Sequence, residues 1–233
     1  MLKSHIRLAG LLFITLSACS SSEDYFPLTK NISRYYRITT EILDETKQQR
    51  QVSAIVEQAE TKHGKVFIMR QNPKTDAYLQ SNTEGIFRLG SRDRHSLTET
   101  WNAEPQKILP AKPQLDSTWT IKSELGLIES RTFARQDRLR NRTIPLALQY
   151  EVKSIDETVT VEAGTFSGCL ALRATGSVVV RTDRGNASAE VIVTQHDWYA
   201  PGVGLVKSYR LEESESPFLK KGTFEQTLIA LNR

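Results

Sequence analysis

The chain has 233 residues, of which 39% are hydrophobic and 25% charged, and a formal net charge of +4. Lys3 and Arg7 lie in the first 18 residues, so the rest of the chain carries a net charge of about +2, which gives no argument for a nucleic-acid partner. The cysteines are Cys19 and Cys169, so a modified Cys19 leaves no intramolecular disulfide and an apolar core must hold the fold.

The N-terminal residues have the order of a bacterial secretory signal. A short basic stretch precedes an apolar run over residues 8–16, and two small residues, Ser17 and Ala18, follow that run. The run is too short for a membrane-spanning helix, which needs about 20 apolar residues. We therefore expect residues 1–18 to be a signal peptide that is removed by cleavage.

The end of this run, Leu16-Ser17-Ala18-Cys19, resembles the lipobox of bacterial lipoproteins. The resemblance implies that the Cys19 thiol carries a diacylglycerol, that cleavage makes Cys19 the first residue, and that its amine is acylated. Several acyl chains anchor more strongly than one, because each buried methylene contributes about 0.8 kcal/mol. The alternative interpretation is a plain secretory signal with an incidental cysteine.

The residue after Cys19 bears on which membrane would hold the protein. Lipoprotein sorting in many Gram-negative bacteria resembles a rule in which aspartate at this position retains the protein in the inner membrane. Ser20 stands there in this chain, so we expect the periplasmic face of the outer membrane. Residues 19–24 would then form a lipidated polar tether to a single β-rich domain over residues 25–233.

Alternation of apolar and polar residues dominates the rest of the chain, and long helical patterns are scarce. Glycine, proline and asparagine separate the alternating runs, as tight turns require. The spacing predicts an all-β fold with an antiparallel curved sheet or a partly closed barrel. The expected strands are 34–42, 50–60, 65–71, 85–90, 117–124, 146–155, 158–164, 169–182, 189–199, 204–213 and 223–231.

Residues 91–116 interrupt this pattern. They contain three prolines, and we expect a loop there that crosses between two sheet segments; it is the candidate boundary if the domain consists of two subdomains. A weak internal echo supports two similar halves, because "GIFRLG" (85–90) and "GLVKSY" (204–209) share a glycine, aliphatic, apolar and basic order.

Three segments carry a resemblance to a family: "DYFPLTKNISRYYRI" (24–38), "VEAGTFSGCLAL" (161–172) and "WYAPGVGLVKSY" (198–209). In this order they are similar to bacterial secreted and lipoprotein sequences with an FPL start, a V-x-A-G-T-F-x-x-C segment and a W-Y-A-P-G-V-G-L-V-K segment. The first segment departs from the pattern at residues 33–36, and the middle of the chain is unmatched. The resemblance implies an all-β fold and no established activity, so it assigns no functional residue.

The glycines and the cysteine of these segments are expected to be structural. Gly164, Gly202 and Gly204 lie where alternation breaks, and glycine permits the positive φ angles that tight turns require. Cys169 begins an apolar strand, and a free cysteine is among the most buried residue types. The alternative role for Cys169 is a nucleophile, which needs a nearby base.

Catalytic and metal-binding patterns are not found in the sequence. His63, His95 and His196 show no metal-ligand spacing, and His196 and Asp197 are neighbours in an expected strand, so they point to opposite faces. We therefore expect no catalytic residue, no metal, no cofactor and no enzymatic activity.

Arginines gather in two places along the chain. One is the run 131–142, and the other is formed by Arg88, Arg92 and Arg94. Such clusters suit contact with anionic lipid headgroups, lipopolysaccharide phosphates or an acidic partner, whereas the alternative is an ordinary solvated loop. The candidate contact residues of the run are Arg131, Arg135, Arg138, Arg140 and Arg142.

These features together predict an outer-membrane-anchored periplasmic lipoprotein with a non-enzymatic binding or envelope-assembly role. Its partners would be the membrane, through the lipid anchor, and a lipid or an envelope protein. The alternatives are a structural scaffold without a pocket, and an enzyme. A carrier of apolar ligands requires a deep apolar cavity, a scaffold fills its concave face with its own side chains, and an enzyme brings polar groups together in a cleft.

Overall fold

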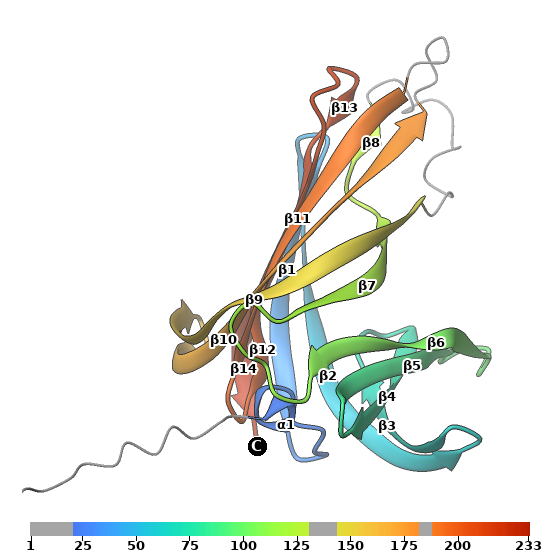
Figure 1. Cartoon of the computed structure of the whole chain (residues 1–233), viewed down its shortest axis with the longest axis vertical. Coiled ribbons are helices and arrows are strands. Elements are labelled where there is room, and N and C mark those ends of the chain that lie inside the picture. The colour runs from blue at the N-terminus through green and yellow to red at the C-terminus, as the bar shows by residue number, and fades with distance from the viewer. Residues whose placement is uncertain (1–20, 131–143, 182–187) are drawn as a thin grey trace, which may run out of the picture.

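The computed structural model describes residues 21–130, 144–181 and 188–233 (Figure 1). Almost all of these residues are in strands, with one short helix at the start. The elements in chain order are α1 (Ser22–Tyr25), β1 (Ser33–Ile42), β2 (Glu45–Thr61), β3 (Gly64–Arg70), β4 (Thr75–Asn82), β5 (Gly85–Asp93), β6 (Glu99–Pro110), β7 (Thr118–Leu125), β8 (Glu129–Ser130), β9 (Ile144–Val161), β10 (Gly164–Arg181), β11 (Ser188–Ala200), β12 (Gly204–Glu213), β13 (Leu219–Lys220) and β14 (Gly222–Asn232).

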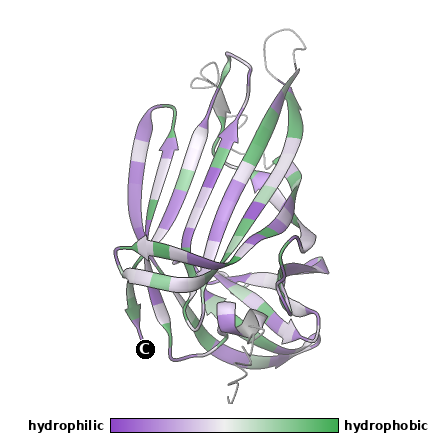
Figure 2. Ribbon diagram, turned by 60° about the vertical axis from the view of Figure 1, so that its left-hand side comes forward, coloured by the Kyte–Doolittle hydropathy of each residue, from purple (hydrophilic) through white to green (hydrophobic). Residues whose placement is uncertain are grey.

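In the described part of the chain, twelve strands form one antiparallel sheet in the order β6-β5-β4-β3-β2-β1-β14-β12-β11-β10-β9-β7. The chain therefore runs up and down between neighbouring strands, and its last strand, β14, returns to pair with its first, β1. The sheet curls into a nearly closed barrel with one gap, between β6 and β7 (Figures 1 and 2). This confirms the prediction of an all-β fold with a curved, partly closed antiparallel sheet.

Side chains close the gap between β6 and β7. The amide of Gln106 on β6 donates a hydrogen bond to the carbonyl of Lys122 on β7, and the Lys122 ammonium lies 3.8 Å from the Glu104 carboxylate. Deeper in the barrel, Leu109 of β6 is fully buried in one cluster with Leu146 and other residues of β9 and β10. The seam is therefore held by packing and a few polar contacts, whereas backbone ladders hold the rest of the sheet.

The sequence-based expectation of a loop over residues 91–116 is wrong for most of that stretch. Strand β5 continues to Asp93, and residues 99–110 form β6. Arg88 pairs with Gln106 and Gly90 pairs with Trp101, so residues 102–105 bulge out of the ladder. Proline is tolerated at such bulges and at sheet edges, which is why Pro105 does not prevent the strand. The chain passes from one half of the sheet to the other after Pro110.

Two six-strand meanders make up the sheet. The first contains β1 to β6, and the second contains β7, β9, β10, β11, β12 and β14. The echoing segments "GIFRLG" and "GLVKSY" lie in β5 and β12, which are each the fifth strand of their meander. Each of these strands begins at a glycine with positive φ, Gly85 and Gly204. The two segments thus hold corresponding places in chain order.

The N-terminal segment packs between the two meanders. Tyr25 lies in the core cluster of β9 to β11, Leu28 lies in the cluster of β2 to β4, and Phe26 contacts both clusters. Apolar and polar residues alternate along the longer strands, as Figure 2 shows, so these longer strands each have one face in the core. Among the described residues, no helix has the length and apolar character needed to cross a bilayer.

Candidate functional site

The first and third family-like segments meet at one end of the barrel. The backbone N–H of Gly202 donates to the carbonyl of Asp24 at 2.7 Å. The Arg34 guanidinium, at the start of β1, donates through Nε to the Val203 carbonyl and through Nη2 to the Pro27 carbonyl at 3.3 Å. Arg34 therefore ties the N-terminal segment to the turn between β11 and β12.

Gly204 leaves room for this guanidinium. Its φ is +101°, and a Cβ atom added there would lie 2.8 Å from Arg34 Nε. Any other residue would meet both backbone strain and the buried side chain. Gly164 and Gly202 also have positive φ, at 137° and 67°, which confirms that these glycines supply turn conformations.

The remaining family-like segment packs at the same end. Phe166 and Ala163 of the β9–β10 hairpin lie in one apolar cluster with Tyr36, Cys169 and Val203. The Tyr36 hydroxyl donates to the Leu205 carbonyl at 2.8 Å, so β1 is bound to β12 next to the Arg34 contacts. All three segments singled out in the sequence are thus parts of one structural unit.

A chamber of about 190 Å³ lies inside the barrel against this unit. Both meanders contribute to its wall, which combines apolar groups, neutral polar groups and one charged group. Pockets for drug-sized ligands are typically about 300–1,000 Å³, so this chamber holds only a small group, with the space of about six water molecules. The lining residues are Phe26, Arg34, Tyr36, Gln51, Ser53, Met69, Gln71, Ile108, Tyr199, Gly204, Leu205 and Gln226.

Arg34 is the charged residue of the chamber wall, and only 4% of its surface is exposed. No carboxylate of the described residues lies within ion-pair distance of it. Burial lowers the pKa of the Arg34 guanidinium, although arginine stays protonated in proteins. The same burial raises the pKa of Tyr36, which keeps this phenol neutral. The chamber therefore contains one positive charge without a counter-charge, which is unfavourable in a protein interior.

A second polar network inside the barrel is fully paired. The Glu212 carboxylate on β12 accepts hydrogen bonds from the backbone N–H groups of Gly126, Leu127 and Ile128, at 2.9–3.2 Å. Arg210 lies 2.8 Å from the same carboxylate and also donates to the Glu124 carbonyl. This network fastens the chain after β7 to β12 across the barrel, so its role is structural.

Asp197 is the other buried carboxylate of this region. It accepts hydrogen bonds from Ser208 Oγ at 2.6 Å and from Gln195 Nε2 at 2.9 Å. Burial raises the pKa of Asp197, and these hydrogen bonds oppose the rise. His196 points to the other face of β11, where its ring lies 5.9 Å from that of Trp198. The predicted separation of His196 from Asp197 is therefore confirmed.

The other histidines also show no metal-binding arrangement. The His63 ring lies 4.5 Å from the Trp101 ring, and the backbone N–H of His95 donates to Asp93 in a turn. Among residues 21–130, 144–181 and 188–233, no group of three metal-ligating side chains comes together.

The arginines predicted to contact an anionic surface are only partly described. Arg131, Arg135, Arg138, Arg140 and Arg142 lie outside the described residues, as does Cys19. The second predicted cluster, Arg88, Arg92 and Arg94, does not form one group. Arg92, Arg94 and Arg70 lie 3.0, 3.8 and 3.4 Å, respectively, from the buried Asp76 carboxylate. Arg88 makes none of these contacts.

Cys169 is fully buried, as predicted. Its thiol donates to the Phe166 carbonyl at 3.4 Å, and burial raises the pKa of the Cys169 thiol, which disfavours the nucleophilic thiolate. This geometry favours packing over a reactive role.

We therefore expect thiol labelling of the folded protein to be slow and to accelerate in denaturant. Cys169→Ser should lower the free energy of unfolding by about 1–3 kcal/mol, because it places a hydroxyl in an apolar site. Ser177→Cys in that variant, at an exposed position of β10, gives a rapidly labelled control. Fast labelling of native Cys169 would contradict the packing role.

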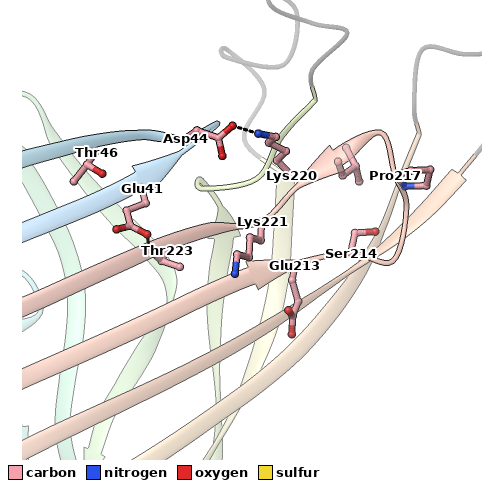
Figure 3. A pocket seen from close by; sticks show the side chains of 10 residues that line it. Glu41, Asp44, Thr46, Glu213, Ser214, Pro217, Lys220, Lys221 and Thr223 are labelled. Atoms are coloured by element: carbon pink, nitrogen blue, oxygen red, sulfur yellow. Dashed lines mark hydrogen bonds and ion pairs between the residues drawn. The ribbon is translucent and has the colours of Figure 1, made fainter.

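A larger hollow of about 750 Å³ opens at the other end of β1 (Figure 3). Its wall is largely polar and carries charges of both signs. Asp44 in the β1–β2 turn binds Lys220, and Glu41 accepts a hydrogen bond from Thr223 at 3.2 Å. This rim hollow therefore carries both acidic and basic side chains, in contrast to the chamber at Arg34.

The chain matches no protein-family model, and no curated protein matches it significantly. Two solved structures are similar to it. One is a candidate lipoprotein from Parabacteroides distasonis ATCC 8503, with 14% identity, a TM-score of 0.35, and coverage of 89% of this chain and 98% of that chain. The other is a candidate exported protein with a YmcC-like fold from Bacteroides fragilis NCTC 9343, with 12% identity, a TM-score of 0.39 and the same coverage.

Proposed function

We propose that this protein is an outer-membrane-anchored periplasmic lipoprotein whose barrel-shaped domain has a non-enzymatic binding role. The observation that carries the binding role is the small chamber of mixed apolar and polar lining, which contains the buried and uncompensated Arg34 at the meeting point of both meanders. The chamber favours a small ligand with a negatively charged or polar group over the apolar or lipidic chain considered from the sequence, because it is too small for acyl chains and contains the Arg34 charge.

The lipobox-like residues that end at Cys19 support the anchor. The folded domain begins close behind that position, since the Asp24 carbonyl already accepts a hydrogen bond from Gly202. A chain from residue 19 to residue 24 reaches at most about 18 Å. A lipid on Cys19 would therefore hold the end of the barrel that contains Arg34 near the membrane surface.

A structural scaffold is the second candidate function. The observation that favours it is the filled interior, where buried core clusters and the Glu212 network occupy the barrel outside the chamber.

Replacement of Cys19 tests the anchor. Cys19→Ala is expected to abolish incorporation of labelled palmitate and the appearance of the mature form, because the thiol is the site of lipid attachment. Wild-type protein is expected in the outer-membrane fraction of a density gradient. Cys169→Ala is the matched control, since it removes the other cysteine and leaves lipidation unchanged. Normal processing and salt-resistant membrane attachment of Cys19→Ala would show that the lipobox interpretation is wrong.

A further inference from the structure

We infer that the Arg34 chamber is a binding site for one compact oxyanion group, such as a phosphate, sulfate or carboxylate. This inference rests on the binding role proposed above and names the chemistry of the ligand. Its starting point is charge. The chamber wall contains a guanidinium and no aspartate or glutamate, so an anion entering the chamber meets an attractive charge without a competing repulsive one.

The hydrogen-bonding capacity of the wall leads to the same conclusion. Within the described part of the chain, the side chains of Gln51, Ser53, Gln71 and Gln226 form no hydrogen bond with another residue, although all four line the chamber. Ser53 is 8% exposed and the three glutamines are half-buried, so these amides and this hydroxyl have donors available for a ligand or for water. Gln51 lies opposite Tyr36, and Ser53 lies opposite Arg34, in the β1–β2 ladder, so donors and cation share one face of the sheet.

The backbone contacts of Arg34 make the site rigid. Two of its nitrogens are occupied by the Val203 and Pro27 carbonyls, and Gly204 is adjacent to the guanidinium. The cation is thus held in place before a ligand arrives, which reduces the entropy lost on binding. A guanidinium that is fixed by carbonyls keeps its full positive charge, because carbonyls supply partial charges only.

Size and position define the ligand further. The chamber volume of about 190 Å³ suits one oxyanion with a few waters, and any larger remainder of the ligand must extend outside. The chamber adjoins the segment that begins at Asp24, which is the end that the proposed lipid on Cys19 would hold near the membrane. The oxyanion is therefore either a free small anion or the phosphate of a lipid headgroup, and the two sources share the chemistry recognised here.

Calorimetric titration of the detergent-purified, full-length mature protein tests the inference. The probes are inorganic phosphate, sulfate, acetate and soluble dihexanoyl phosphatidate, with glucose as an uncharged comparison. We expect saturable binding of at least one oxyanion and none of glucose. Phosphatidate that binds more tightly than inorganic phosphate identifies the lipid headgroup as the source, and equal affinities identify a free anion. Absence of saturable oxyanion binding by the folded wild-type protein would overturn the inference and leave the Cys19 anchor unaffected.

Three variants assign the binding to the chamber. Arg34→Gln should weaken it by about tenfold or more, since it removes a charge-assisted hydrogen bond. Gln226→Leu changes the chamber wall and leaves the Arg34 contacts in place. It should weaken binding, and it tests the assignment even if the Arg34→Gln variant does not fold. Arg37→Gln is the matched control, because Arg37 lies on the same strand and pairs with Glu162 at 2.7 Å. Equal loss in Arg37→Gln, or unchanged binding in Gln226→Leu, would overturn the assignment.

Discussion

Glu212→Ala is expected to lower the free energy of unfolding by about 3–5 kcal/mol, the largest effect of any single substitution considered for the folded domain. The Glu212 carboxylate is fully buried and bonded to Arg210 and to the backbone N–H groups that follow β7. Its removal leaves the Arg210 cation without its counter-charge and leaves buried N–H donors unpaired. Chemical denaturation, followed by circular dichroism, measures the loss.

Two variants make this result specific. Glu213→Ala changes the next, exposed residue of β12 and should alter the stability by less than about 0.5 kcal/mol. Glu212→Gln keeps an acceptor and should lie between wild type and Glu212→Ala. Hydrogen exchange should show loss of protection at Leu127 and Ile128 in the alanine variant. A Glu212→Ala protein as stable as wild type would contradict the structural role of this network.

Leu109→Ala is expected to destabilise the protein by about 2–5 kcal/mol, which is the range for truncating a fully buried leucine. Leu109 is 0% exposed and belongs to β6, yet it packs in the core cluster of the second meander with Leu146 and Leu148. Since no backbone ladder joins β6 to β7, this packing is a principal contact across the seam. The substitution should therefore loosen the barrel at its gap.

Leu115→Ala supplies the matched control, because Leu115 lies in the connection between β6 and β7 and is 57% exposed. Its truncation should change the stability by less than about 0.5 kcal/mol. Faster amide exchange in β6 and β7 of Leu109→Ala, but not of Leu115→Ala, is the expected signature. If both leucine variants unfold at the same denaturant concentration, side-chain packing does not close the seam.

Most strands were predictable from sequence because one face of each is buried and the other is exposed, which produces alternation. Strand β4 could not be predicted in this way, since Ala77, Tyr78 and Leu79 are successive buried residues that pack against apolar clusters on both faces of the sheet. Strand β6 was hidden by its prolines, which a sheet edge with a bulge accommodates. The pairing of β1 with β14 joins the two ends of the domain. No local sequence pattern predicts it, because the two strands are far apart in the chain.

The candidate site was only partly predictable. Positive φ at Gly164, Gly202 and Gly204 and the burial of Cys169 followed from local pattern and are confirmed. The contact of Arg34 with the turn between β11 and β12 could not be predicted from the local sequence, because its partner Val203 is 169 residues away in the chain. One signal was present, since Arg34 shares a strand face with the buried residues Tyr36 and Ile38, where a cation is unusual.

Lipid attachment at Cys19 stays a prediction from sequence, as does the contact of the arginines in residues 131–142 with an anionic surface. The anchor is the more consequential of the two, because it decides the compartment and therefore which anions are present around the site proposed at Arg34.

Mass spectrometry of the N-terminal proteolytic peptide, from protein extracted out of membranes, tests this central claim most directly. The account predicts a peptide that begins at Cys19, lacks residues 1–18 and carries the added mass of a diacylglycerol and an N-acyl chain. A peptide that begins at another residue, or an unmodified Cys19 within a longer peptide, would contradict it.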